Sequence, residues 1–189
     1  MNTMTNKHPE TEEVVASINE CLDCIKQLDD CHLLNYYPLA YMQIFVKFQK
    51  LLYSQFEMYC LGKVSSSGYC PARKHLFDDE IELRAFLKTK TEYIDYDDRI
   101  SELSEYIFND SPFAKLFCLE PQGYVMLKHI RNHIAHESPS SYKKLYDARI
   151  LKDNQTIGQY FAGRSKKNTI RFNELIKSIY DFSNYIIEG

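Results

Sequence analysis

Apolar residues along this chain recur mostly at spacings of three and four, the pattern of helices that bury one side. No segment shows a convincing alternation of apolar and polar residues, which is the pattern of a half-buried strand. The pattern therefore predicts an all-α protein, an antiparallel bundle of about five to seven helices. The six longer helices are expected at residues 9–30, 38–62, 78–88, 97–109, 121–138 and 169–187.

Prolines and loop-forming residues mark where these helices begin and where loops lie. Proline is well tolerated in the first turn of a helix and stops a helix that precedes it. Helix starts are therefore placed at Pro9, Pro38 and Pro121. Pro139 is expected to end the fifth helix. The remaining segments are expected to form a loop, a short helical turn and a long irregular connection, at residues 63–75, 111–121 and 139–168 respectively.

The composition is typical of one globular domain spanning residues 1–189. An apolar content of 44% can fill a core without disulfides or metal ions, and the six Gly and six Pro favour helices over loops. No stretch approaches the roughly 18 apolar residues of a membrane span, and the N-terminus lacks the apolar centre of a secretory signal. We therefore expect a cytoplasmic protein with no membrane partner.

The six cysteines are spread through predicted helices and one loop, so we expect reduced thiols rather than a disulfide framework. One stretch, CLDCIKQLDDCH, has a spacing similar to that of zinc motifs. Its soft ligands would be Cys21, Cys24, Cys31 and His32. Cys21 falls on the apolar stripe of the first helix, however, where a small buried thiol is common. We interpret the spacing as fortuitous and expect no metal and no other cofactor.

Positive charge is concentrated in one segment of a chain whose net charge is −3. Residues 143–171 contain eight basic and two acidic side chains, a local charge of +6. Such a segment has the charge expected of a surface that binds a polyanion, although a solvated charged loop would have the same composition. The side chains expected to bind RNA are Lys143, Lys144, Arg149, Arg164, Lys166 and Lys167.

The stretch LKHIRNHIAHESP, residues 127–139, concentrates histidines on a helix that otherwise has an ordinary buried stripe. At about 100° per residue, one side of the helix collects Met126, Leu127, Ile130 and Ile134. The opposite side collects Lys128, His129, Asn132 and His136, with Arg131 and His133 on the flanks. The amide of Asn132 lies four residues before His136 and is expected to orient its imidazole by a hydrogen bond.

Three chemistries are compatible with this polar face. His129, His133 and His136 lie on successive turns, as helical zinc sites require, but no H-E-x-x-H pattern accompanies them. The histidines could alternatively be polar residues on an exposed face without a function. The third chemistry is metal-free phosphoryl transfer on RNA. A histidine would move protons and a guanidinium would neutralise charge on the phosphate oxygens.

For this third chemistry the relevant groups are Arg131 and His136. On a straight helix these two residues stand about 140° apart, so one helix does not present them side by side. The same helix from a second copy, related by a twofold axis, would bring an arginine and a histidine to one phosphate.

The sequence RNHIAH, residues 131–136, resembles the arginine, polar residue, spacer and histidine motif of the HEPN superfamily, the higher eukaryotes and prokaryotes nucleotide-binding domains. The resemblance implies an all-α bundle and, in many members, a metal-independent endoribonuclease that acts as a dimer. It implies that Arg131 stabilises the pentacoordinate phosphate, that His136 is the general acid or base, and that Asn132 orients the site. His133 and His129 would have supporting roles.

The function expected from this resemblance is that of a toxin, abortive-infection or defence ribonuclease that leaves 2′,3′-cyclic phosphate ends. Its partners would be an RNA substrate, a second copy of the chain, and an antitoxin or regulatory protein. The alternative is a catalytically inactive HEPN-like module that binds a partner protein or a nucleotide through the same face.

Overall fold

The computed structural model describes residues 3–90, 96–118 and 123–189 of the chain. Within these residues the chain forms nine α-helices and no strand, which confirms the predicted all-α class. A short 3-10 helix, η1, spans Pro9–Thr11 before the first of them. The α-helices are α1 (Glu12–Ile25), α2 (Asp30–Cys60), α3 (Glu80–Lys90), α4 (Tyr96–Ile107), α5 (Pro112–Cys118), α6 (Tyr124–His136), α7 (Pro139–Asp147), α8 (Ile157–Ala162) and α9 (Arg171–Glu188).

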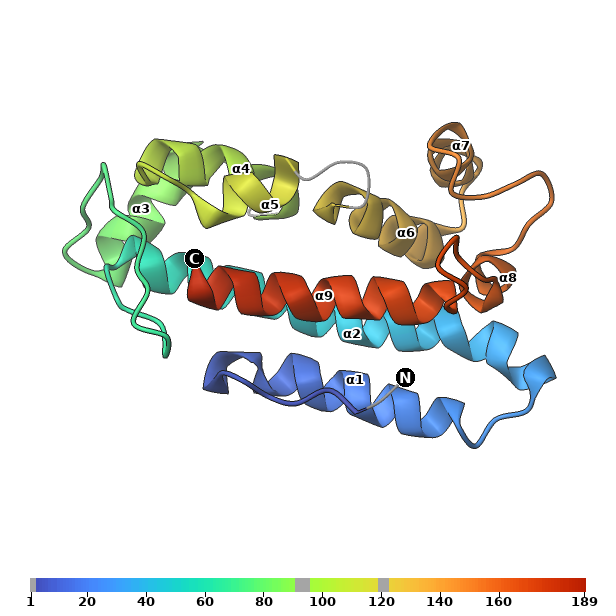
Figure 1. The fold of residues 1–189 in the computed structure, drawn as a ribbon. Helices are drawn as coiled ribbons and strands as arrows, with labels where there is room; N and C mark the ends of the chain where they lie inside the picture. Colours follow the sequence, from blue (N-terminus) through green and yellow to red (C-terminus); the bar gives the residue numbers. More distant parts are fainter. Residues whose placement is uncertain (1–2, 91–95, 119–122) are drawn as a thin grey trace.

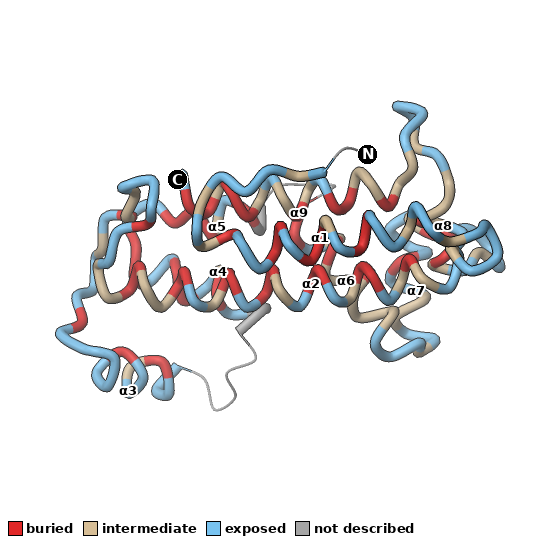
Figure 2. Tube along the Cα trace, turned by 90° about the horizontal axis from the view of Figure 1, so that it is seen from below, coloured by how far each residue is buried: buried red, intermediate tan, exposed pale blue. Residues whose placement is uncertain are grey.

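The helices pack around a central pair, α2 and α9 (Figure 1). Helix α1 lies along one side of this pair, and α4, α5 and α6 lie along the other. Helix α3 lies at one end of the bundle, whereas α7 and α8 lie at the opposite end. Figure 2 shows buried positions recurring at helical spacing along each long helix, which is the stripe that the sequence pattern predicts.

The expected antiparallel packing applies to α1 and α6 against α2, but α9 runs parallel to α2. Near the start of both helices, the ring of Phe172 lies 4.8 Å from that of Tyr37, measured between centroids. Near their ends, the Tyr59 hydroxyl donates a 2.7 Å hydrogen bond to the Ile186 carbonyl. The direction of α9 follows from the connection before it, because α7 and α8 keep the chain at the end of the bundle where α2 begins.

Helix α2 begins eight residues earlier than predicted, and Pro38 lies inside it rather than at its start. Asp29 caps the helix, since its side chain accepts a 3.1 Å hydrogen bond from the His32 amide. Proline has no N–H to donate, so the Leu34 carbonyl loses its partner four residues later. Gly158 of α8 packs against this carbonyl so closely that a Cβ would collide with it. Helix α8 therefore covers the carbonyl that Pro38 leaves without its helical hydrogen bond, and α2 continues through the proline that we expected at its start.

The predicted irregular connection at residues 139–168 is wrong, because α7 and α8 occupy much of it. Pro139 ends α6 as expected and also provides the first turn of α7, with Ser138 as its cap. Helix α8 starts with a capping box formed by Thr156 and Gln159. Both helices are too short to show a helical stripe clearly, but each contributes one fully buried large side chain, Leu145 and Phe161 respectively.

The other boundaries agree with the prediction to within a few residues. Helix α1 ends at Ile25 instead of residue 30, while the predicted loop at 63–75 contains no helix. The proposed helix start at Pro121 lies outside the described residues. Among the helices that are described, none combines the length and the apolar content needed to cross a membrane.

Candidate functional site

The candidate site lies on α6, whose position is fixed by its apolar stripe. Leu127 and Ile130 are fully buried, and Met126 and Ile134 pack against the core at its edge, as predicted. The hydroxyl of Tyr41 on α2 donates a 2.8 Å hydrogen bond to the Leu127 carbonyl, within the site helix. The orientation of α6 is therefore set by buried contacts, and its polar residues are directed away from the core.

Three polar residues of α6 line a pocket of about 170 Å³ together with the start of α7. His129 and Asn132 are partly buried in its wall, whereas His136 is exposed. The pocket brings together residues that the sequence predicted separately as catalytic, supporting and RNA-binding. It also includes three serines that we did not predict. The lining residues are His129, Asn132, His136, Ser138, Ser140, Ser141 and Lys144.

Arg131 lies beside this pocket and does not line it. Its Nη1 donates a 3.0 Å hydrogen bond to the Asn132 Oδ1 atom. Its Nε is buried and has no hydrogen-bond partner among the described residues. The predicted hydrogen bond between Asn132 and His136 is not formed within the described part of the chain, because the amide oxygen accepts from the charged guanidinium instead. Asn132 thus orients Arg131 rather than His136.

His133 joins α6 to α7 on the flank of the site. Its Nδ1 lies 3.0 Å from the hydroxyl of Ser141, and that hydroxyl donates a 2.8 Å hydrogen bond to the Ser138 carbonyl. In this arrangement Ser141 accepts from the protonated Nδ1 of His133. The ring of Tyr142 packs at 6.0 Å from the imidazole, measured between centroids. His133 therefore has a structural role: it holds the start of α7 against α6.

Burial lowers the pKa of His133, and the nearby Glu137 carboxylate opposes this shift more weakly. The folded chain therefore keeps this imidazole neutral at pH values where an unfolded histidine, with an ordinary pKa of 6.5, takes up a proton. Because the unfolded state binds more protons, the free energy of unfolding should fall as the pH drops below about 6.5. We expect His133→Gln to flatten this pH dependence in urea unfolding between pH 7.5 and 5. The same substitution at exposed His32 is the control, and an equal slope in both variants would contradict the assignment.

The three histidines of α6 do not form the metal site that was one alternative. Among the described residues, the group of potential ligands whose atoms lie close enough for one ion is Asp29, Cys31 and His32, within 4.8 Å of one another. These side chains are exposed at the start of α2, where Cys31 and His32 both hydrogen-bond to Asp29.

The four residues of the zinc-like spacing do not lie together either. Cys21 is buried in the core, where its Sγ lies 3.9 Å from the Ala40 carbonyl, as its position on the apolar stripe predicts. Cys24 is exposed near the end of α1 and is not part of the group with Cys31 and His32. The cysteines whose side chains are described carry free thiols.

The predicted RNA-binding residues divide into those on α7 and those near the turn before α9. Lys143 and Lys144 are exposed on α7, and only Lys144 lines the pocket. Arg164 is used within the turn, since its Nη1 donates hydrogen bonds of 2.9 and 3.1 Å to the backbone and side-chain oxygens of Asn168. Lys166 and Lys167 are exposed in the same turn, and Arg149 follows α7 with a left-handed backbone. Both groups lie at the end of the bundle that carries α7 and α8 (Figure 1).

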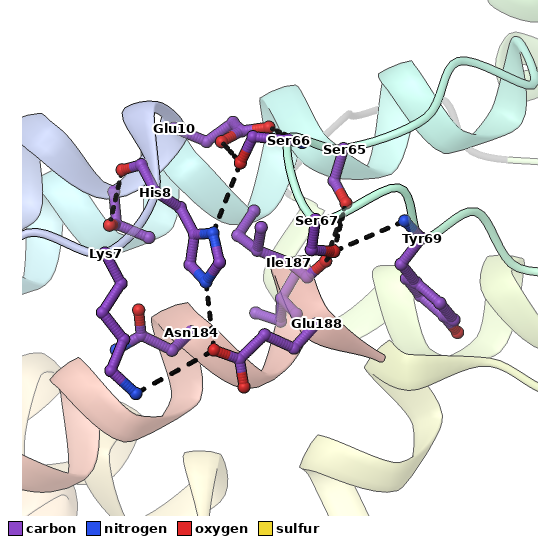
Figure 3. A network of polar contacts seen from close by, with 12 residues as sticks. Lys7, His8, Glu10, Ser65, Ser66, Ser67, Tyr69, Asn184, Ile187 and Glu188 are labelled. Carbon is purple, nitrogen blue, oxygen red and sulfur yellow. Dashed lines mark hydrogen bonds and ion pairs between the residues drawn. The ribbon is translucent and has the colours of Figure 1, made fainter.

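A second polar network joins the two ends of the chain (Figure 3). His8 lies between the Glu188 carboxylate, 3.0 Å from its Nε2, and the Ser66 hydroxyl, 3.4 Å from its Nδ1. The order serine, histidine, glutamate resembles a nucleophilic triad, but the Ser66 hydroxyl donates a 2.6 Å hydrogen bond to Glu10. Its proton is therefore directed away from the imidazole. We interpret this network as a structural contact that holds the segment around His8 against the end of α9.

Comparison of the chain with protein-family models, with curated proteins and with solved structures yields no match. The interpretation of the site therefore depends on its own residues and on the RNHIAH motif.

Proposed function

We propose that this protein is a metal-independent endoribonuclease of the HEPN type, with roles in toxicity, abortive infection or defence. The observation that carries the proposal is the arrangement at the end of α6. Asn132 and His136 share a polar pocket with Lys144, and Asn132 holds Arg131 beside that pocket through a 3.0 Å hydrogen bond. A proton-transfer group and a guanidinium thus lie next to a surface suited to a phosphate.

The proposed reaction is an attack by the 2′-hydroxyl of RNA on the adjacent phosphorus. The 2′-oxygen to phosphorus bond forms, the bond from phosphorus to the 5′-oxygen breaks, and the products are a 2′,3′-cyclic phosphate and a 5′-hydroxyl. His136 acts as general acid or base, taking the 2′-hydroxyl proton or protonating the 5′-oxygen. Arg131 neutralises the charge that builds up on the phosphate oxygens in the transition state.

We place the complete site between two copies of the chain. Arg131 and His136 stand about 140° apart around α6, so the two side chains of one copy point in different directions. The outer face of α6 is open in a single chain: Val125 is 42% exposed, and Ala135 and His136 are exposed about three turns further along. If two copies packed together through this face about a twofold axis, Arg131 of one copy would lie beside His136 of the other.

The proposal is tested by the requirement for metal and by the chemistry of the product ends. Purified protein should cleave single-stranded RNA in excess EDTA. The new ends should be 5′-hydroxyls and cyclic phosphates, and mild acid should open the cyclic phosphates to a mixture of 2′- and 3′-phosphates. Activity that disappears with chelator, or products with 5′-phosphate and 3′-hydroxyl ends, would show that the chemistry is different.

The second candidate function is a catalytically inactive module that binds a partner protein or a nucleotide through the same face. It is favoured by the surroundings of Arg131. Its Nη1 already donates a hydrogen bond to Asn132 and its Nε is buried, so the guanidinium offers fewer donors to a substrate. RNA that is bound but never cut by the wild-type protein, whatever its sequence, would support this candidate.

A further inference from the structure

The pocket between α6 and α7 is distinct from the position of Arg131, although the two are adjacent. Its walls come from one face of α6 and from the first two turns of α7. His136 lines the pocket, while Arg131 lies outside it and is linked to it through Asn132. In the composite site, His136 of this copy meets Arg131 of the second copy, so the scissile phosphate would lie on the His136 side of the pocket. The rest of the pocket is then available to another group of the same ligand.

The charge of the pocket favours an anion. None of its lining residues is acidic, and they include Lys144 and two histidines. Lys144 is exposed and forms no ion pair with any described residue, so its ammonium can meet a ligand. The start of α7 adds the positive end of a helix dipole. There, Ser138 caps the Ser141 amide at 3.2 Å.

The hydroxyls at the start of α7 are grouped and supported from α6. The Ser138 Oγ lies 3.1 Å from the hydroxyls of both Ser140 and Ser141. Ser141 is in turn held by His133, at 3.0 Å. The hydroxyl cluster is therefore positioned before any ligand arrives, which reduces the entropy cost of binding.

The size of the pocket restricts what it can hold. Its volume is about 170 Å³. Pockets for drug-sized ligands usually measure about 300–1,000 Å³, so a whole nucleotide would not be enclosed here. A single phosphate group with part of its sugar matches the space and the set of donors.

We propose that this pocket binds the RNA phosphate next to the one that is cleaved, with the Lys144 ammonium and the Ser140 hydroxyl as its donors. This inference rests on the proposed ribonuclease function, in which Arg131 and His136 act on the scissile phosphate. It adds a second phosphate subsite and predicts a preference for RNA chains with at least two consecutive phosphates. Lys144 is a binding residue here, and no proton transfer is assigned to it.

The test compares a dinucleoside monophosphate, which has only the scissile phosphate, with a trinucleoside diphosphate. In each, a 2′-deoxyribose at the cleavage position prevents reaction, so that binding is measured independently of catalysis. We expect Lys144→Gln to weaken binding of the trinucleotide about tenfold, because one charge-assisted contact is lost. Binding of the dinucleotide should not change. The slope of log affinity against log salt should fall by about one for the trinucleotide.

Lys63→Gln is the matched control, since it removes the same charge from an exposed site in the loop directly after α2. Helix α2 ends at the opposite end of the bundle from α7. Ser140→Ala, which leaves the net charge unchanged, should also weaken binding of the trinucleotide and leave binding of the dinucleotide unchanged. An equal effect of Lys144→Gln on both ligands, or no effect on either, would overturn the inference. Adenosine monophosphate or inorganic phosphate that binds as tightly as the trinucleotide would also overturn it, because the pocket would then recognise a free phosphate.

The two proposals fail in different ways. If reactive RNA is never cut but the trinucleotide still binds through Lys144, the ribonuclease proposal fails and the pocket remains an RNA phosphate site. If RNA is cut and Lys144→Gln leaves trinucleotide binding unchanged, the subsite is wrong and the ribonuclease proposal stands.

Discussion

His136→Ala is expected to lower kcat for RNA cleavage in EDTA at least about 100-fold, because it removes the group that moves protons in the proposed reaction. KM should change much less, since His136 is one of seven residues around the pocket and Lys144 remains. The side chain is exposed at the last residue of α6, so its loss creates no cavity and the fold should be retained. Initial rates on a fluorescent oligonucleotide measure both parameters.

Two other histidines provide controls for this result. His32→Ala removes an exposed imidazole at the start of α2 that does not line the pocket, and should leave kcat unchanged. His129→Ala removes a pocket residue two turns before His136 and should affect KM more than kcat. A kcat that is equally reduced by His129→Ala and His136→Ala would indicate that the pocket as a whole, rather than His136, is needed. Full activity of His136→Ala would refute the assignment of the general acid or base.

The long helices were predictable because each has enough turns to show which side is buried. Helix α6 illustrates this: the angles around its axis correctly separated Leu127 and Ile130 from the polar face. Pro38 misled the prediction because a proline inside a helix and a proline at its start have the same local pattern. Only contact with a segment distant in sequence, at Gly158, distinguishes them.

The residues proposed for the candidate site come from the sequence, whereas their geometry comes from the structure. The motif identified Arg131, Asn132 and His136, and the pattern of charge identified Lys144. The sequence could not show that Asn132 accepts from Arg131 rather than contacting His136, because on a helix the four-residue spacing favours a contact and adjacent residues do not face each other. The long side chain of Arg131 makes the contact across that angle.

The serines of α7 were missed although a signal was present. The stretch SPSS, residues 138–141, has a capping serine followed by a proline, which is a typical helix start. The sequence pattern places Ser138 at the end of the preceding helix and residues 139–141 in an irregular connection, so it does not indicate these hydroxyls as ligand donors. Recognising α7 would also have shown that Ser140 and Lys144, four residues apart, share a face.

A mixture of Arg131→Ala and His136→Ala proteins is expected to regain activity that neither variant has alone. If each site takes Arg131 from one copy and His136 from the other, a mixed dimer contains one intact site and one site that lacks both groups. Random exchange of subunits makes about half of the dimers mixed, so activity should reach about a quarter of the wild-type level. Cleavage rates would be measured after incubation at high concentration, which allows the subunits to exchange.

The matched control places both substitutions in one chain and mixes it with the wild type. A mixed dimer of this kind has no intact composite site, since each site lacks either its arginine or its histidine. Subunit exchange should therefore reduce the activity of the wild-type protein below that of the unmixed sample. Sites contained within one chain predict the reverse in both experiments: no recovery in the first mixture, and no loss in the second. The comparison distinguishes the two arrangements because the number of substitutions is the same and only their distribution between the copies differs.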